Sequence, residues 1–282
     1  MLGRMGKDAG SLLGVEIASD SVRMVQLRRR KGRYEPIAWA LEAFEPFAAG
    51  DWWQAPDRVV AALRSAYRHS GSRQRRAAVA LPASQVICKL CQLPANQPET
   101  EMEAQLLADA DRLFPFPLED LVMDFQLLGA SSVHVGMQDV MVAACRQTVL
   151  QPLEALFDEA GLQLEVVEVD SIALQRLVPL PRTGGCALLR LEPDSATLHS
   201  WSQEVLPQRR ALALERLGES FVDGLQLDDL VVTGTAMLEQ GRLQALSERL
   251  NVPCRLLPSL EGLECHDSSM ALACALALGG LH

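Results

Sequence analysis

The chain has 282 residues, 49% of them hydrophobic, and its formal net charge at pH 7 is −10. This length and composition predict a protein that is folded throughout and has two lobes. The acidic balance argues against general affinity for nucleic acid or acidic membranes, because such affinity comes mainly from Lys and Arg side chains that neutralise phosphates. We therefore expect its partners to be proteins or small molecules.

Cysteine usage and hydropathy indicate a cytoplasmic protein. Seven cysteines, an odd number, are scattered from Cys88 to Cys274 without a disulfide framework, which is typical of a reducing compartment. Residues 1–11 lack an apolar stretch long enough for a signal peptide and are predicted to form a flexible tail. Residues 268–282 hold about a dozen apolar residues, fewer than the roughly 20 of a membrane span, so they predict a buried terminal helix.

The first predicted elements are a three-stranded meander and a helix. Apolar residues alternate at strand period through Val15, Ile17, Val22 and Met24, and residues 34–44 follow as a third strand after a very basic turn. Residues 55–71 then place apolar side chains at helical spacing and end in a glycine. We expect this amphipathic helix to pack on the meander.

The middle of the chain alternates strands and helices. Residues 99–114 predict one helix with Met102, Leu106 and Leu113 on one stripe, ended by the rigid Pro-Phe-Pro that follows. The other predicted strands are 75–82, 85–94, 121–129 and 139–146, followed by a helix over 149–162 and a strand running into a helix over 163–178. The second half predicts a hairpin over 185–202, a strand and glycine turn over 227–238, and a helix over 239–251.

Several of these stretches resemble the PilM family of type IV pilus assembly proteins, which is related to FtsA. The opening "LLGVEIASDSVRMVQL" is similar to the first phosphate loop of that family. The stretches "VICKLCQLP", "EMEAQLLADADRLFPFPLEDLVMDFQLLG" and "DVMVAACRQTVLQPLEALFDEAGLQLEVVEVDSIAL" follow in the order and spacing of the family. The run from Phe114 to Asp120 is the most specific piece, and the resemblance is good over residues 11–178.

The resemblance implies an α/β, actin-like (ASKHA, ribonuclease H-like) fold of two lobes. It implies a tail over residues 1–11, a first actin-like subdomain over 12–76, an inserted FtsA/PilM-type subdomain over 77–170, and a second, reduced lobe over 171–282. Fewer residues separate the second and third nucleotide loops than in the family. One wall of the cleft is therefore expected to be reduced.

The resemblance also lets the ATP site be compared position by position. In the first loop Ser19, Ser21 and Arg23 keep the chemistry of the family. Three positions of that loop differ: Glu16 stands for Asp, Ala18 for Gly, and Asp20 for Ser. An added carboxylate beside phosphates repels them.

The other two nucleotide loops depart from the family as well. Its Asp-Ile-Gly falls on Arg190, Leu191 and Glu192, and the Pro193 that follows has no N–H to donate. In the adenosine loop Thr233 and Gly234 are kept, but Thr235 replaces the second glycine. We expect a vestigial ATP site at Ser19, Ser21, Arg23, Thr233 and Gly234, with no catalytic residue, no required cofactor and no metal; weak binding of ATP with magnesium stays open.

The resemblance further implies a cytoplasmic scaffold, peripherally associated with the inner membrane, in the assembly platform of a type IV pilus or a related DNA-uptake pilus. Its partner would be a PilN-like bitopic membrane protein, bound through its N-terminal cytoplasmic peptide, with membrane association indirect and no direct nucleic-acid binding. Phe114, Phe116 and Leu118 are the candidate partner contacts, in a turn stiffened by prolines that suits either a core edge or a groove wall. The alternatives are an active ATPase that regulates pilus assembly and the equivalent component of a type II secretion system.

Three remaining features have simpler explanations. Cys88 and Cys91 have the spacing of a zinc or redox pair, but no second pair lies nearby, so we expect core packing. The five histidines, His69, His134, His199, His266 and His282, lie in different elements without a recurring nucleophile or carboxylate pairing, which gives a hydrolytic triad little support. The basic turn at residues 28–33 is either a solvated hairpin or a contact with anionic lipid.

Overall fold

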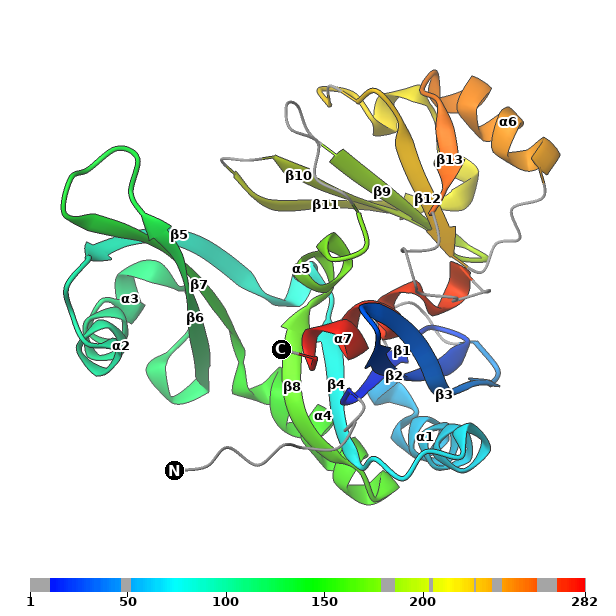
Figure 1. The fold of residues 1–282 in the computed structure, drawn as a ribbon, viewed down its shortest axis with the longest axis horizontal. Helices are drawn as coiled ribbons and strands as arrows, with labels where there is room; N and C mark the ends of the chain where they lie inside the picture. Colours follow the sequence, from blue (N-terminus) through cyan, green and yellow to red (C-terminus); the bar gives the residue numbers. More distant parts are fainter. Residues whose placement is uncertain are drawn as a thin grey trace. The chain divides into compact units, whose positions relative to one another are not determined.

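The computed structural model describes residues 11–46, 52–178, 186–202, 205–225, 227–234, 240–257 and 268–281 (Figure 1). The chain divides into two compact units: unit 1 is Met1–Leu81 with Leu156–His282, and unit 2 is Pro82–Ala155. Unit 2 lies within the segment 77–170 that the sequence assigns to an inserted subdomain; the predicted domain boundaries themselves stay a prediction. The predicted tail lies outside the described residues except for Ser11, which is buried and donates its N–H to the carbonyl oxygen of Leu27 at 2.7 Å.

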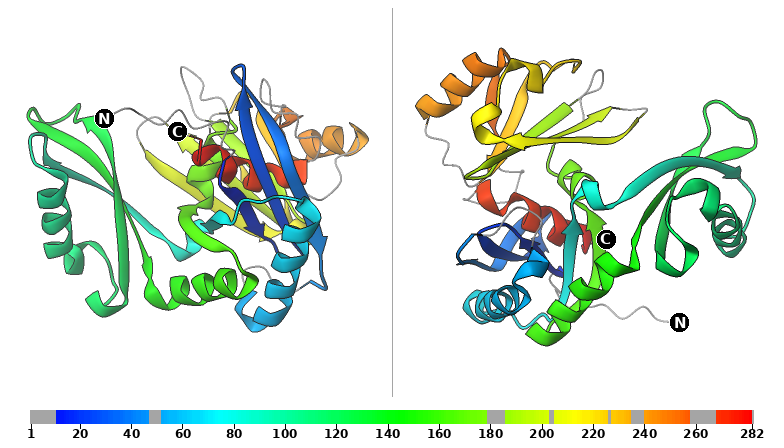
Figure 2. Two further views of the ribbon diagram at one scale, coloured as in Figure 1. Left: turned by 60° about the horizontal axis from the view of Figure 1, so that its bottom comes forward. Right: turned by 180° about the vertical axis from the view of Figure 1, so that it is seen from behind.

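The first sheet of unit 1 has five strands in the order β3-β2-β1-β4-β8. Their bounds are Leu13–Ile17 (β1), Ser21–Arg30 (β2), Arg33–Ala43 (β3), Arg76–Leu81 (β4) and Gln163–Val169 (β8). Strands β1 to β3 pair antiparallel, whereas β1 with β4 and β4 with β8 pair parallel. Helix α1 (Pro56–Ser70) packs on β2 and β3 and ends at Gly71, whose φ is 69°. The predicted meander and its covering helix are confirmed (Figure 2).

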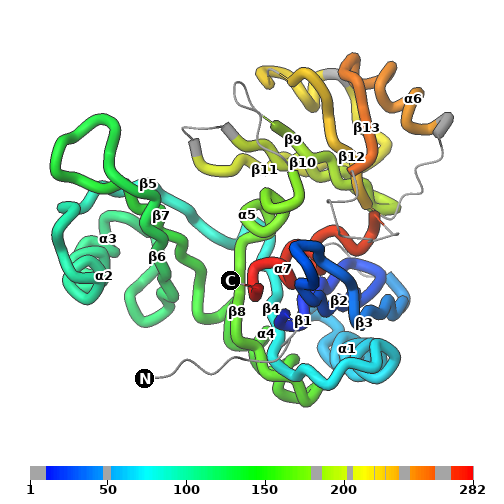
Figure 3. The backbone as a smooth tube through the Cα atoms, in the orientation of Figure 1, coloured from blue at the N-terminus to red at the C-terminus, as the bar shows by residue number. Residues whose placement is uncertain are grey.

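The last helix of the chain covers the same sheet. Helix α7 (Ala271–Gly279) packs on β1 and β2, and its seven residues from Ala271 to Ala277 are all buried. Gly14 makes this approach feasible, because a Cβ atom at that position would lie 1.9 Å from the carbonyl oxygen of Ala273. The tube in Figure 3 shows α7 (red) beside β1 (blue). The predicted buried terminal helix is confirmed.

The second sheet of unit 1 also has five strands, in the order β11-β10-β9-β12-β13. Their bounds are Cys186–Leu191 (β9), Ser195–Ser202 (β10), Val205–Ala213 (β11), Leu230–Gly234 (β12) and Cys254–Leu256 (β13). The predicted hairpin is β9 with β10, and the predicted late helix is α6 (Gln240–Leu250). The sequence did not predict β11, which contains Pro207; proline is tolerated there because β11 is an edge strand.

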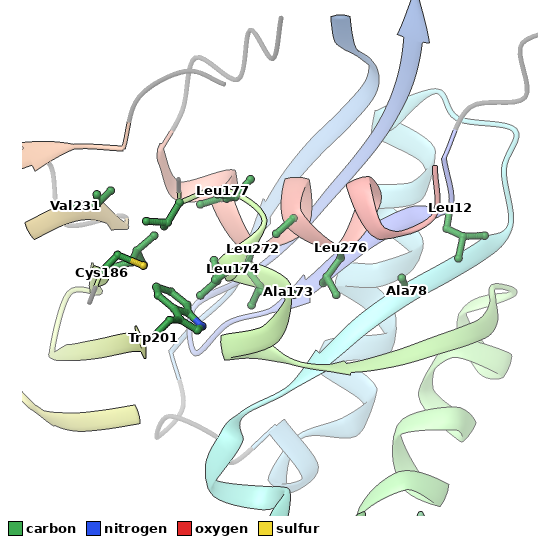
Figure 4. Close-up of a cluster of buried hydrophobic side chains, with 14 residues drawn as sticks. Leu12, Ala78, Ala173, Leu174, Leu177, Cys186, Trp201, Val231, Leu272 and Leu276 are labelled. Atoms are coloured by element: carbon green, nitrogen blue, oxygen red, sulfur yellow. The ribbon is translucent and has the colours of Figure 1, made fainter. Parts of the chain in front are cut away.

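A hydrophobic cluster joins the two sheets of unit 1 (Figure 4). It combines Leu174 of helix α5 (Asp170–Gln175) with Leu188 of β9, Trp201 of β10 and Leu276 of α7. Burying one such large side chain contributes about 1.5–3 kcal/mol. Segments that are far apart in the sequence therefore hold the two sheets together through one core.

Unit 2 has a three-stranded antiparallel sheet in the order β5-β7-β6, accompanied by two short helices. The bounds are Ile87–Pro94 (β5), Leu121–Ala130 (β6), Met137–Arg146 (β7), Glu99–Ala108 (α2) and Ala110–Leu113 (α3). Its core includes Met102, Leu106 and Phe114. Helix α4 (Gln147–Ala160), which contains Pro152 and is followed by Gly161 with φ 77°, runs from unit 2 into unit 1.

The single helix predicted over residues 99–114 is wrong in one respect. The structure divides it at Asp109, whose φ and ψ are −91° and 0° and whose carbonyl accepts from the N–H groups of Arg112 and Leu113. Aspartate is a weak helix former that favours the first position of a new turn, so the chain restarts there. Across the described ranges, no helix has the length and apolar character that crossing a membrane requires.

Candidate functional site

The turn between β1 and β2 is closed by its own hydrogen bonds. The N–H of Ala18 donates to the carbonyl oxygen of Ser21 at 2.8 Å, and the hydroxyl of Ser21 donates to Oδ1 of Asp20 at 2.8 Å. The N–H of Phe44, just beyond β3, donates to the carbonyl oxygen of Asp20 at 2.8 Å. Ser19 is half-buried in the same turn. The turn that the sequence assigns to a phosphate is thus a compact link between two strands, with one serine hydroxyl already engaged.

Arg23 of β2 is the centre of the site. Its side chain is fully buried, and its guanidinium contacts three carboxylates: Nη1 is 3.1 Å from Oε1 of Glu16, and Nη2 is 3.3 Å from Oδ1 of Asp20 and 3.2 Å from Oε2 of Glu192. Nη1 also donates to the carbonyl oxygen of Ser269 at 3.3 Å. Burying a guanidinium is costly unless such acceptors satisfy most of its donors.

Arg190 of β9 completes the arrangement. Its Nε donates to Oε1 of Glu192 at 2.8 Å, and its Nη2 pairs with Oε1 of Glu16. We call the five side chains the charged cluster: Glu16, Asp20, Arg23, Arg190 and Glu192. Three carboxylates and two guanidinium groups give it a formal charge of −1, and it links the first sheet to the second.

The charged cluster is nearly dry. The exposed fractions of the Glu16, Glu192 and Arg190 side chains are 3%, 13% and 15%. Within the part of the chain that the structure describes, Oε2 of Glu16 and Nε of Arg23 are buried without a hydrogen-bond partner. Removing one partner from a buried ion pair leaves an uncompensated charge, which typically costs about 3–5 kcal/mol. The cluster therefore resists rearrangement by a ligand.

Thr233 and Gly234, at the end of β12, lie beside the cluster. The hydroxyl of Thr233 is buried and donates to the carbonyl oxygen of Ser268 at 2.5 Å, next to the Ser269 carbonyl that Arg23 contacts. A Cβ atom on Gly234, whose φ is 121°, would lie 2.0 Å from the carbonyl oxygen of Leu191. Thr233 thus ties β12 to the segment just before α7, and Gly234 permits the close approach of β12 to β9. Thr235 lies outside the described residues.

Three of the five predicted nucleotide residues are thus engaged by the protein itself. Ser21, Arg23 and Thr233 each donate to a carboxylate or carbonyl of the chain. Around the cluster and elsewhere in the described ranges, no group of three or more His, Cys, Asp or Glu side chains is arranged to hold a metal ion. The assignment of these residues to nucleotide binding stays a prediction.

The predicted partner contacts in unit 2 differ in accessibility. The Phe114 side chain is 3% exposed and belongs to the core of unit 2. Phe116 is half-buried, with the Arg146 guanidinium 5.1 Å from the ring centroid, and Leu118 is 50% exposed. Leu118 and the exposed part of Phe116 are thus accessible to a partner, whereas Phe114 packs in the core of unit 2.

One histidine contacts a serine that is distant in the sequence. His199 of β10 lies with its Nδ1 2.8 Å from Oγ of Ser171, at the start of α5, and Ser171 donates to Asp170 at 3.2 Å. The sequence did not reveal this pairing of a histidine with a serine. Burial, with smaller effects from Arg190 and Arg209, lowers the pKa of His199 to about 3, so its ring is neutral.

This arrangement does not form a hydrolytic triad. The carboxylate of Asp170 contacts the serine, whereas a triad needs it on the histidine. The His199 ring instead stacks on Trp201, with ring centroids 6.2 Å apart, and Trp201 donates to the carbonyl oxygen of Ser171 at 2.9 Å. The group ties α5 to β10. The only sequence signal for this group was an Asp-Ser pair at a helix start. That pair does not identify which histidine contacts the serine.

The two cysteines of β5 are partly buried. Cys88 and Cys91 are half-buried, and Cys91 packs against the core of unit 2. Burial raises the pKa of the Cys91 thiol. The prediction of core packing is confirmed for Cys91.

Solved structures with the same fold define the class of this protein. A PilM–PilN type IV pilus biogenesis complex contains a chain that is 22% identical, with a TM-score of 0.71, and the match covers 96% of this chain and 99% of that one. The cytoplasmic domain of EpsL from Vibrio cholerae, an inner-membrane component of the type II secretion system, is 17% identical with a TM-score of 0.51 (96% of each chain). The ethanolamine utilization protein EutJ of Carboxydothermus hydrogenoformans is 9% identical with a TM-score of 0.55 (97% and 90%). The fold is the actin-like one, as the sequence predicted.

The family follows from the sequence itself. Residues 14–183, more than half of the chain, match the family described as type IV pilus assembly protein PilM. The chain therefore belongs to the PilM family, and the resemblance noted in the sequence is confirmed.

Proposed function

We propose that this protein is a cytoplasmic scaffold of a type IV pilus assembly platform that binds the N-terminal cytoplasmic peptide of a PilN-like membrane protein and does not turn over ATP. Membership of the PilM family supports the pilus role. The similar solved chain, which comes from a complex with PilN, supports the choice of partner. The likeness to the EpsL domain rests on fold alone and gives no separate support for a role in secretion.

The charged cluster is the observation that supports the absence of turnover. Magnesium is held by oxygen ligands, but the carboxylates of Glu16 and Glu192 already accept from Arg23 and Arg190. A triphosphate would add negative charge beside a cluster whose formal charge is already −1. Binding of Mg-ATP would therefore have to break buried ion pairs before it gained any contact.

Unit 2 supports the peptide-binding part of the proposal. Its sheet has β5 and β6 at its two edges, so each has a row of backbone groups facing away from β7. Next to these edges, apolar side chains are exposed at Leu90, Leu118, Leu127 and Leu128. Extended peptides bind such edges by main-chain hydrogen bonds and gain specificity from apolar pockets.

The test is calorimetry with a synthetic peptide that has the first dozen or so residues of the PilN-like protein encoded by a neighbouring reading frame. We expect micromolar affinity, about −8 kcal/mol, which moderate salt weakens without abolishing. A scrambled peptide of the same composition is the control. Equal heats for the two peptides, or none for either, would remove the partner assignment, and phosphate release from ATP above background would favour an active ATPase instead.

A further inference from the structure

The β2–β3 hairpin carries charge and apolar surface that the proposed function does not use. Its exposed basic tip consists of Arg29, Arg30, Lys31 and Arg33. Farther along β3, three large side chains form an exposed apolar stripe: Ile37 (42% exposed), Trp39 (63%) and Leu41 (41%). The left view of Figure 2 shows this hairpin (blue) extending beyond α7 (red).

Strand register places Arg29, Trp39 and Leu41 on one face of the sheet. Trp39 lies opposite Val25, which packs in the same hydrophobic cluster as α7. Tyr34 packs against that cluster too, and the guanidinium of Arg29 lies 5.8 Å from its ring centroid. Leu41 is two residues from Trp39 and so shares its face. Because α7 covers β1 and β2, this face of the edge strand β3 is left open.

The two acidic residues of β3 lie on the opposite face. Glu35 pairs with Arg28 at 3.4 Å, and Oε2 of Glu42 lies 3.0 Å from Nδ1 of His69 in α1. Among the ion pairs of the described residues, none engages Arg30, Lys31 or Arg33. The open face of the hairpin therefore carries Arg29 and large apolar side chains without a carboxylate, whereas Arg30 and Arg33, which lie opposite each other at the tip, share the other face with Glu35.

We propose that the basic tip and the apolar stripe bind the surface of an anionic membrane. Cations near such a surface are attracted to its lipid headgroups, and tryptophan is favoured at the boundary between headgroups and acyl chains. The charge of the whole chain does not prevent this, because acidic groups farther away than about 10 Å are screened at 0.1 M salt. The contact is direct and separate from the peptide interaction, in addition to the indirect association that the family resemblance implies.

Vesicle sedimentation tests the proposal. The full chain is mixed at about 0.1 M salt with vesicles of phosphatidylcholine and phosphatidylglycerol, or of phosphatidylcholine alone. We expect sedimentation with the anionic vesicles only. Replacing Arg30, Lys31 and Arg33 together by Ser should weaken this binding by tenfold or more, since each cation near the surface contributes about 1 kcal/mol. Trp39→Ser should weaken it as well.

Matched variants separate this surface from total charge and apolarity. Replacing the exposed Arg68, Arg73 and Arg112 by Ser removes the same charge elsewhere, and Trp53→Ser removes a tryptophan that is 47% exposed. Both controls should bind anionic vesicles like the wild type. Unchanged melting temperatures and unchanged binding of the PilN-like peptide would show that the hairpin variants are folded and that the peptide interaction is a different one.

The emission of Trp39 gives a second readout. The difference between the spectra of the wild type and Trp39→Phe should shift to shorter wavelength with anionic vesicles. The proposal is overturned if the wild type does not sediment, if it binds neutral vesicles equally, or if hairpin and control variants behave alike. Self-association that Trp39→Ser abolishes, without vesicle binding, would assign the surface to a second copy of the chain instead.

Discussion

Nη2 of Arg23 lies 3.2 Å from Oε2 of Glu192, although the two residues are 169 positions apart. Arg23 belongs to the first sheet and Glu192 directly follows β9 of the second, so this pair fastens one sheet of unit 1 to the other. Resemblance to the PilM family assigns both residues to loops of a nucleotide site, an assignment that stays a prediction. Here the side chains of the protein itself make the connection.

The first prediction concerns that connection. Arg23→Ala should lower the free energy of unfolding by about 3–5 kcal/mol, because it leaves Glu16 and Glu192 with less compensation in a buried site. Urea denaturation measures the change. As a control, Arg112→Ala breaks an ion pair with Asp109 in which the arginine is 85% exposed, and should cost no more than about 0.5 kcal/mol. Similar small losses for both variants would contradict a role of the cluster in stability.

ATP with magnesium should not stabilise the protein. A ligand at a hundred times its dissociation constant raises the free energy of unfolding by about 2.7 kcal/mol, which a thermal scan detects readily. We expect no such shift with ATP and magnesium and no phosphate release, whereas the PilN-like peptide should produce a shift in the same instrument. A clear shift with ATP would mean that the charged cluster opens for nucleotide.

Gly14→Ala should destabilise the protein by about 3 kcal/mol or more, because the added methyl group meets backbone atoms of α7 that cannot move aside. The nearest of them, the carbonyl oxygen of Ala273, would lie only 1.9 Å away. Gly218→Ala is the matched control, since no atom lies within 4 Å of its Cβ position. Thermal unfolding that ranks the two variants equally would show that β1 and α7 are not in this contact.

Acid should destabilise the protein through His199. The unfolded chain binds a proton at His199 below the usual pKa of 6.5, whereas the folded protein does so only near 3, so stability falls as the pH drops between these values. From pH 7 to about pH 5 this residue should account for about 2 kcal/mol of lost stability. Between these two pH values the free energy of unfolding of His199→Asn, measured by urea titration, should therefore fall by about 2 kcal/mol less than that of the wild type. His69→Asn, at a side chain that is 69% exposed, should keep the acid loss of the wild type.

Two substitutions in unit 2 separate packing from partner binding. Phe114→Ala should cost about 3–5 kcal/mol of stability, because its ring is buried among Met102, Leu106 and Val140. Leu118→Ser changes a side chain that is 50% exposed, so it should leave the melting temperature nearly unchanged. It should weaken the binding of the PilN-like peptide that calorimetry measures. Undiminished peptide affinity in Leu118→Ser would remove this leucine from the proposed site.

The sequence predicted what local periodicity encodes. The meander, α1 and α7 follow from the spacing of apolar residues, and Gly71 ends α1 as expected. The break at Asp109 was missed because one unfavourable residue does not interrupt an apolar stripe. Strand β11 was missed because Pro207 disfavours a strand except at an edge, and edge position depends on pairings that a single segment does not reveal.

The candidate site was predictable only in part. Family resemblance located Glu16, Asp20, Arg190 and Glu192 as departures from a nucleotide site, and Arg23 as a residue that keeps its chemistry, but not the ion pairs among them. Each pair depends on the approach of two sheets whose strands lie far apart in the chain. The same holds for Ser171 and His199, which are 28 residues apart and share no motif. Long-range pairing of this kind has no periodic signature in a sequence.

The contact of α7 with β1 also bears on how the protein is made. A ribosome releases β1 early, but the surface that β1 and β2 present to α7 stays uncovered until residues 271–277 have emerged. Val25 and Leu27 are among the side chains that α7 covers in the folded protein. The first sheet therefore reaches its native packing only after the second sheet has been synthesised. Its apolar surface stays exposed during most of translation, which is the period in which chaperones can bind it.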